Sequence, residues 1–149
     1  MTTISSVVVE ICAPAQFVWD ILVDYPHYPQ WNPYTVAVAT TLEIDSPIDL
    51  TLPAPDGSGG TFVNREFIRV VKPPHHLRYD TGDSIPGIFA VRDQWIEERG
   101  PARCVYHTSD TFSGEHAGWV IKNNGGWVKK GFDAVAHALK ARAELLLQG

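Results

Sequence analysis

The fold is decided by residues 127–148, WVKKGFDAVAHALKARAELLLQ, near the end of the 149-residue chain. Apolar residues recur there in steps of three or four, and they are Val128, Phe132, Val135, Leu139, Ala143 and Leu146. This spacing places them on one stripe of a helix. The charged residues that fall outside this stripe are Lys129, Lys130, Asp133, Lys140 and Glu144. The stretch therefore predicts a long helix that buries one face.

Upstream of this helix the period of the apolar residues changes to two. The stretches with this strand-like alternation are 34–44, 48–52, 61–71, 77–81, 89–98 and 102–113. Turn residues separate them, and the longest such segment is the loop 53–60, PAPDGSGG. Strands that follow one another through short turns form an antiparallel meander.

Two shorter elements precede the meander. Residues 4–12 alternate and are rich in Val and Ile, which predicts a first strand. Pro14 then begins a short helix that ends before Tyr25-Pro26, and residues 28–33 form a second short turn or helix between prolines. A seven-stranded sheet of this kind must bury its apolar concave face, and only the last helix is long enough to cover it. We expect an α+β helix-grip fold, one domain over residues 1–149, with a curved sheet wrapped around the C-terminal helix.

Composition excludes several classes of protein. The chain is 44% hydrophobic and 19% charged, which is typical of a folded globular protein. Its net charge of -5 argues against binding to duplex nucleic acid or to anionic membranes. No apolar run approaches the ~20 residues that cross a bilayer. A signal peptide has basic residues before its apolar stretch, and the N-terminus has none there, so we do not expect a signal peptide. We expect a cytoplasmic monomer or homodimer that is not inserted in a membrane.

Several segments resemble a known superfamily. VEICAP (9–14), VWDILVDY (18–25) and YPQWNP (28–33) resemble the opening of START-like helix-grip proteins, and the most similar branch is the SRPBCC, polyketide cyclase/dehydrase-like family. VKPP (71–74), DTFSG (110–114), FDA (132–134) and ALKARAE (138–144) also resemble this family, although its members more often have Glu at the position of Asp110. The resemblance spans nearly the whole chain. It implies a hydrophobic cavity between sheet and helix, which in family members holds lipids, sterols, polyketides or plant metabolites.

The resemblance implies more than one function, because the family shares no catalytic motif. The first hypothesis is a protein that binds a small hydrophobic or aromatic metabolite, polyketide-, terpenoid- or lipid-like, in this cavity. The second is a cofactor-free cyclase or dehydratase, a lyase that uses a cavity carboxylate as general acid or base. A co-chaperone-type interaction module is a third hypothesis, for which the sequence offers no evident docking patch.

The predicted last strand contains the first catalytic candidate, Asp110. Alternation places Tyr106, Thr108, Asp110 and Phe112 on one face, and the two aromatic residues indicate that this face points inward. Desolvation in an apolar cavity would raise the pKa of Asp110 toward neutrality, as general acid–base catalysis requires. The alternative is a carboxylate that only hydrogen-bonds backbone amides or the long helix.

Glu66, Tyr79 and His107 are the other catalytic candidates. Glu66 shares a strand face with Asn64, opposite a face that carries both aromatic and arginine side chains. It is therefore either a second cavity carboxylate or half of a cross-strand ion pair. Asp93 is a weaker candidate of the same kind. Two carboxylates in one cavity would favour acid–base lyase chemistry.

Aromatic and apolar residues supply the predicted ligand-binding surface. They are Phe62, Phe67, Phe89, Trp95, Tyr106, Phe112, Trp119, Trp127, Val128 and Phe132. The alternative is that most of them are ordinary core residues. Trp119 and Trp127 flank NNGG (123–126), whose turn-forming residues lead us to expect the helix to begin near Trp127. The other interpretation is a kink in a longer helix at the cavity mouth.

No metal or cofactor is expected. His75 and His76 are adjacent, and the other four histidines are scattered over different predicted elements without the spacing of metal ligands. Of these, His27 and His116 remain possible proton carriers at the cavity rim. Glycine-rich dinucleotide and nucleotide motifs and the G-x-S-x-G motif are all missing from the sequence.

Overall fold

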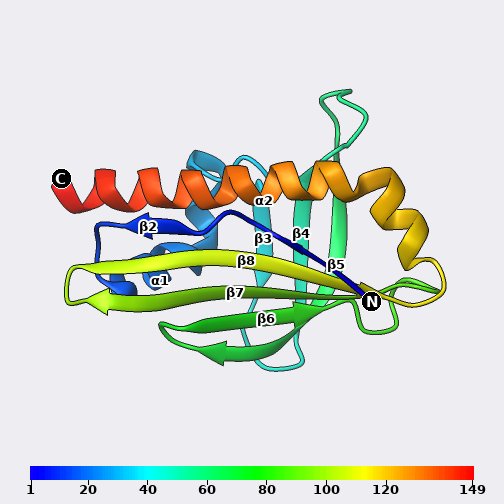
Figure 1. Ribbon diagram of the computed structural model, residues 1–149, viewed down its shortest axis with the longest axis horizontal. Coiled ribbons are helices and arrows are strands. Elements are labelled where there is room, and N and C mark those ends of the chain that lie inside the picture. Colours follow the sequence, from blue (N-terminus) through cyan, green and yellow to red (C-terminus); the bar gives the residue numbers. More distant parts are fainter.

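A strongly curved antiparallel sheet holds the long helix α2 (Ala117–Gln148) against its concave side in the computed structural model, which describes residues 1–149 (Figure 1). The strands are β1 (Thr2–Ser5), β2 (Val9–Ile11), β3 (Ala37–Thr40), β4 (Pro47–Pro53), β5 (Thr61–Lys72), β6 (His76–Asp80), β7 (Phe89–Gly100) and β8 (Arg103–Ser113). The short helix α1 (Ala15–Leu22) and the 3-10 helix η1 (Tyr25–Gln30) follow β2. The predicted α+β helix-grip architecture is confirmed.

The strand order is β1-β8-β7-β6-β5-β4-β3, with every pair antiparallel. The predicted first strand, residues 4–12, differs in one respect, because it is divided into β1 and β2, which both pair with β8. The register shifts by one residue between the pairs Ser5↔Ser109 and Val9↔Tyr106. The sheet therefore has eight strands where the alternation predicted seven, because one extra residue interrupts the pairing.

The buried face of α2 closely follows the predicted stripe. Phe132 and Leu139 are almost completely buried, whereas Leu146 is 43% exposed and does not belong to the core. The stripe thus ends at Ala143, since the last turn of the helix lacks a covering element. None of the helices is both long and apolar enough to cross a membrane.

The start of α2 corrects the sequence-based expectation. The helix begins at Ala117, not near Trp127, and residues 123–126 lie inside it. Ala117 packs with Ala90 and Phe112, and Ile121 joins this cluster. These contacts offset the ~1 kcal/mol that each glycine costs a helix. The first turns of α2 bend away from the axis of the rest (Figure 1), so the helix is kinked.

Candidate functional site

A cavity of about 190 Å³ lies between the concave face of the sheet and the first half of α2. Its apolar lining residues are Tyr34, Leu52, Phe62, Ile85, Ile88, Ala90, Phe112, Val120, Trp127 and Val128. Its polar lining residues are Asn64, Glu66, Thr81, Asp110 and Asn124. A cavity of about 150 Å³ is known to hold benzene, whereas drug-sized pockets measure ~300–1,000 Å³. The space fits one ring with a short substituent.

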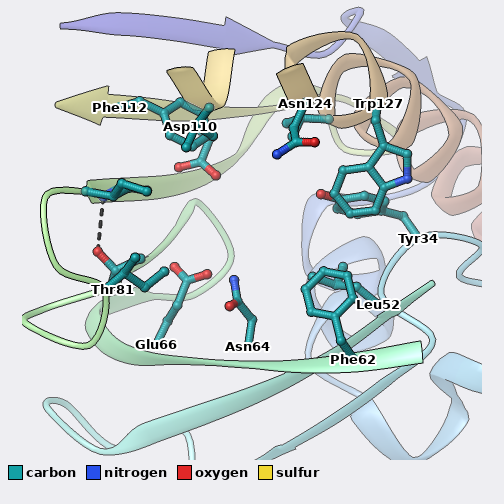
Figure 2. A pocket seen from close by; sticks show the side chains of 15 residues that line it. Tyr34, Leu52, Phe62, Asn64, Glu66, Thr81, Asp110, Phe112, Asn124 and Trp127 are labelled. Carbon is teal, nitrogen blue, oxygen red and sulfur yellow. Dashed lines mark hydrogen bonds between the residues drawn. The ribbon is translucent and has the colours of Figure 1, made fainter. Parts of the chain in front are cut away.

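Asp110 reaches the cavity from β8. Its cross-strand neighbours are Ile4 on β1 and Arg92 on β7. Figure 2 shows its carboxylate pointing into the cavity, where the Oδ1 atom is buried and has no hydrogen-bond partner. The structure thus places Asp110 on the inward face that the alternation of β8 predicted.

Glu66 comes from the opposite wall, on β5. It is only 6% exposed, its Oε1 atom has no hydrogen-bond partner, and its carboxylate points toward that of Asp110 (Figure 2). The sequence did not decide which face of this strand points into the cavity. The structure decides it, since Ile68 on the same face is buried whereas Arg65 on the other face is exposed and pairs with Asp49.

Burial changes the protonation of both carboxyl groups. Desolvation raises the pKa of Asp110 to about 7, with Arg92 opposing the shift and Asp93 adding to it. Desolvation also raises the pKa of Glu66 well above its usual value, and the charge of Asp110 raises it further. Near neutral pH the two groups therefore retain protons that exposed carboxylates would have lost.

A buried arginine lies beside the two carboxyl groups. Arg92 is 6% exposed, its Nε donates a hydrogen bond to Thr108 Oγ1 at 2.7 Å, and its guanidinium carbon lies 4.1 Å from the centroid of the Phe132 ring. Its side chain makes no ion pair with a carboxylate. Arg92 therefore acts on Asp110 and Glu66 through its charge and not through a direct hydrogen bond.

An aromatic wall closes one side of the cavity (Figure 2). The ring centroids of Tyr34 and Trp127 are 5.2 Å apart, and those of Phe62 and Trp127 are 6.2 Å apart. Gly131 on α2 makes room for this wall, because a Cβ atom there would lie 2.2 Å from the Tyr34 ring. A side chain at position 131 would displace Tyr34 from the cavity.

The loop that carries Ile85 and Ile88 closes another side of the cavity. This loop is attached to the start of α2, because His116 donates a backbone hydrogen bond to the carbonyl of Gly87 at 2.9 Å. A Cβ at Gly87 would lie 2.2 Å from the His116 ring. Neither His116 nor His27 lines the cavity, so the structure does not support the idea that they carry protons at its rim.

Three further predicted residues lie in the core beside the cavity and do not line it. Tyr79 and Tyr106 are bound through their hydroxyl groups to Gln94, and Phe132 lies beneath the Arg92 guanidinium. Alternation in the last strand correctly indicated that Tyr106 points inward, and the helical stripe correctly indicated that Phe132 is buried. Neither pattern could show that other side chains fill the space between these residues and the cavity.

Five predicted site residues lie outside the cavity, which corrects their assignment. They are Phe67, Phe89, Trp95, His107 and Trp119. His107 projects from β8 on the face opposite to Asp110 and stacks with Trp95 on the outer side of the sheet. Trp119 is 64% exposed because its position on α2 faces solvent. The weaker candidate Asp93 is also on the outer face, where it pairs with Arg78 at 2.7 Å and His76 at 2.6 Å.

The sequence analysis missed several lining residues. Asn64 could have been found, since it shares the inward face of β5 with Glu66. Tyr34 opens the stretch 34–44, which was predicted as a strand, but β3 begins only at Ala37, so alternation does not report the direction of the Tyr34 side chain. Ile85 lies in a loop, where no period applies. Asn124 lies in the stretch that was expected to precede the helix. The structure has no group of three or more His, Cys, Asp or Glu side chains arranged to hold a metal ion.

Comparisons with solved structures agree on the fold. An aromatase/cyclase from Streptomyces sp. R1128 superposes with a TM-score of 0.73 at 18% identity, over 96% of this chain and 93% of that chain. A START superfamily protein from Mycobacterium smegmatis gives 0.69 at 20% identity, over 97% and 98%. The di-domain aromatase/cyclase BexL gives 0.70 at 14% identity, and the chain spans 93% of its own length but only 46% of that longer protein.

The sequence comparisons give the family. No curated protein is similar enough to count as a relative. The family model described as "Polyketide cyclase / dehydrase and lipid transport" matches residues 2–144. The resemblance drawn from the sequence is thereby confirmed, and the chain belongs to the polyketide cyclase/dehydrase and lipid transport family.

Proposed function

We propose that the protein binds a small ring-containing metabolite in this cavity and catalyses a cofactor-independent dehydration or ring closure by proton transfer through Asp110 and Glu66. The observation that carries the proposal is the pair of carboxyl groups whose buried oxygens lack partners in a mostly apolar cavity. A buried polar atom without a partner costs about 1–3 kcal/mol, and more when charged. Groups kept at such a cost, with perturbed pKa values, are typical of functional sites.

The pKa of Asp110 suits it to proton transfer. At a pKa of about 7, its protonated and ionised forms are both populated at neutral pH. In the dehydration of a β-hydroxy ketone, the ionised carboxylate would take the proton from the carbon beside the carbonyl. The other carboxyl group, still protonated, would give its proton to the departing hydroxyl, which leaves as water.

A carrier without catalytic activity is the second candidate, favoured by the ten hydrophobic residues among the fifteen that line the cavity. In a carrier the two carboxyl groups would only hydrogen-bond the ligand. The volume of about 190 Å³ argues against an intact lipid as cargo, because it is below the ~300 Å³ at which drug-sized pockets begin.

A one-ring β-hydroxy ketone, 4-hydroxy-4-phenylbutan-2-one, distinguishes the two candidates. An enzyme of the proposed kind converts it to the conjugated enone, whose near-ultraviolet absorbance reports the rate. We expect Asp110→Asn, which keeps the shape but removes the titrating proton, to lower the rate roughly 10²–10⁴-fold while the affinity stays within a few-fold.

The matched control is Asp49→Asn, which removes a carboxylate on the outer face of the sheet and whose rate should equal that of the wild type. If the probe binds but neither loses water nor exchanges its α-protons with deuterated solvent, the carrier is supported and the enzyme proposal fails. An equal rate for Asp110→Asn and the wild type would contradict the role of Asp110.

A further inference from the structure

The buried charges around the cavity do not cancel. Glu66 and Asp110 each contribute a carboxyl group, and Arg92 contributes one guanidinium. With both carboxylates ionised, this group has a net charge of one negative unit inside the protein. Because desolvation raises the pKa values of both acids, the group corrects this imbalance by retaining a proton.

No other side chain supplies the missing positive charge. Among the acidic groups near these two, Asp80 is paired with Arg69 at 3.0 Å and Asp93 with Arg78 at 2.7 Å, both away from the cavity. The nearby phenols of Tyr34 and Tyr79 have pKa values raised by burial, so they stay neutral. The residues that α2 contributes to the lining are uncharged, and they are Val120, Asn124, Trp127 and Val128.

The remaining walls fit a cation. Tyr34, Phe62 and Trp127 form an aromatic wall, and aromatic faces attract cations within ~6 Å of the ring. The unpartnered atoms, Glu66 Oε1 and Asp110 Oδ1, are acceptors when ionised. An ammonium group has three donors and no acceptor, so it is the chemical complement of two ionised carboxylates.

We propose that the ligand of this cavity is a small organic monocation, a one-ring amine, whose charge takes the place of the proton retained by Glu66 and Asp110. The inference rests on the proposed function, because it names the substrate class of the same site. In such a complex Asp110 would be ionised and ready to accept a proton, and the ammonium N–H would replace the displaced carboxyl proton as the donor to the departing hydroxyl.

Three probes of nearly equal size and different charge test this inference, namely 2-phenylethylamine, 2-phenylethanol and 3-phenylpropionate. Titration calorimetry at pH 6 and pH 8 gives their affinities. Asp110, with a pKa of about 7, changes from mostly protonated to mostly ionised over this interval. The affinity of the amine should therefore rise about tenfold from pH 6 to pH 8, because the amine itself, like Lys with a pKa of ~10.4, stays protonated.

The neutral alcohol provides the reference for shape alone. At pH 8 the amine should bind at least about tenfold more tightly than the alcohol, whose affinity should not rise with pH. At pH 8 the propionate should not bind measurably, because Asp110 is then ionised and already balances Arg92, so a second anion would be an unbalanced negative charge. At pH 7, amine binding in two buffers of different ionisation enthalpy should report the release of a proton.

Variants show whether the two carboxyl groups cause this preference. Glu66→Gln and Asp110→Asn should each remove the advantage of the amine over the alcohol while the alcohol still binds. Retained alcohol binding also shows that the variant is folded. Asp49→Asn, which removes an exposed carboxylate on the outer face of the same sheet, should leave the advantage unchanged.

The contrary outcomes separate the two proposals. If the alcohol or the propionate binds as tightly as the amine at pH 8, the monocation inference is overturned and the proposed function remains. If the amine preference is found but no variant or probe shows proton transfer, the proposed function fails and the inference stands. If none of the three probes binds, the cavity is not a binding site and both fail.

Discussion

The two faces of the sheet carry the same kinds of residues in opposite situations. On the outer face, each of three aspartates has an arginine partner: Asp49 pairs with Arg65, Asp80 with Arg69 and Asp93 with Arg78. On the inner face, Glu66 is buried and Asp110 is half-buried, and each has a buried carboxylate oxygen with no partner. The difference shows that residue type does not identify a functional carboxylate. What identifies it is the missing partner, because a buried polar atom without a hydrogen bond costs the folded protein free energy.

The aromatic residues repeat this contrast. Trp95 on the outer face is stacked on His76 with ring centroids 3.6 Å apart, so its ring surface is already covered by the protein. Trp127 on α2, which faces the inner side of the sheet, lines the cavity. A ligand can therefore gain contacts on the inner face that the outer face no longer offers.

The largest effect on stability is expected at the helix that covers the inner face. Phe132→Ala should lower the free energy of unfolding by about 3–5 kcal/mol, because it opens a cavity under Arg92 in a fully packed site. Urea denaturation measures the loss. Leu146→Ala, on the same stripe but exposed, is the control and should change little. A loss below about 1 kcal/mol at Phe132 would mean that this face of α2 is not core.

Removing the inner-face carboxylate of Asp110 should stabilise the protein. The pKa of Asp110 is about 7 in the folded protein and ~3.9 when unfolded, so the folded state binds the proton more tightly and stability is lost as the pH rises from about 4 to 7. Asp110→Asn cannot ionise, so it should gain up to about 4 kcal/mol over the wild type at pH 8 and almost nothing at pH 4. A variant less stable than the wild type at pH 8 would contradict this.

An outer-face carboxylate should behave in the opposite way. Asp93→Asn leaves the Arg78 guanidinium without its charged partner and weakens the bond to His76, which should cost about 1–3 kcal/mol at pH 7. Urea denaturation measures this loss. If Asp93→Asn stabilised the protein as Asp110→Asn does, the distinction between the two faces would be lost.

The smallest effect is expected at the exposed pair of Asp49 and Arg65. Both side chains are solvent-accessible, so their ion pair is screened and contributes little. Asp49→Asn should therefore shift the urea midpoint too little to separate it from the wild type. A clear loss of stability would show that exposed pairs help to hold the outer face.

Much of the fold could be predicted because the apolar residues repeat regularly. The stripe through Phe132 and the alternation of the strands gave the helix and the meander. The division of the first strand could not be predicted, because a one-residue shift near Ser6 depends on how the edge pairs with β8. The start of α2 was missed because the contacts of Ala117 outweigh the glycines that follow it.

The site was less predictable than the fold. The inward direction of Asp110 followed from its aromatic neighbours on β8, whereas Glu66 stayed ambiguous because Phe67 and two arginines share the other face of its strand. Tyr34 and Asn124 come from segments far apart in the chain (Figure 2). Only the curvature of the sheet and the bend of α2 bring them to one cavity, and neither feature can be recognised from the spacing of apolar residues in the sequence.

The most direct test of the account is the titration of the carboxyl groups themselves by carbon-13 NMR, with Asp110→Asn and Glu66→Gln used to assign the two signals. The account predicts that Asp110 titrates near pH 7 and that Glu66 titrates well above the usual range of a glutamate. The outer-face aspartates serve as internal controls in the same spectra. If every carboxyl group titrated below about pH 5, as exposed acids do, Glu66 and Asp110 would not be unpartnered buried acids and the account would be wrong.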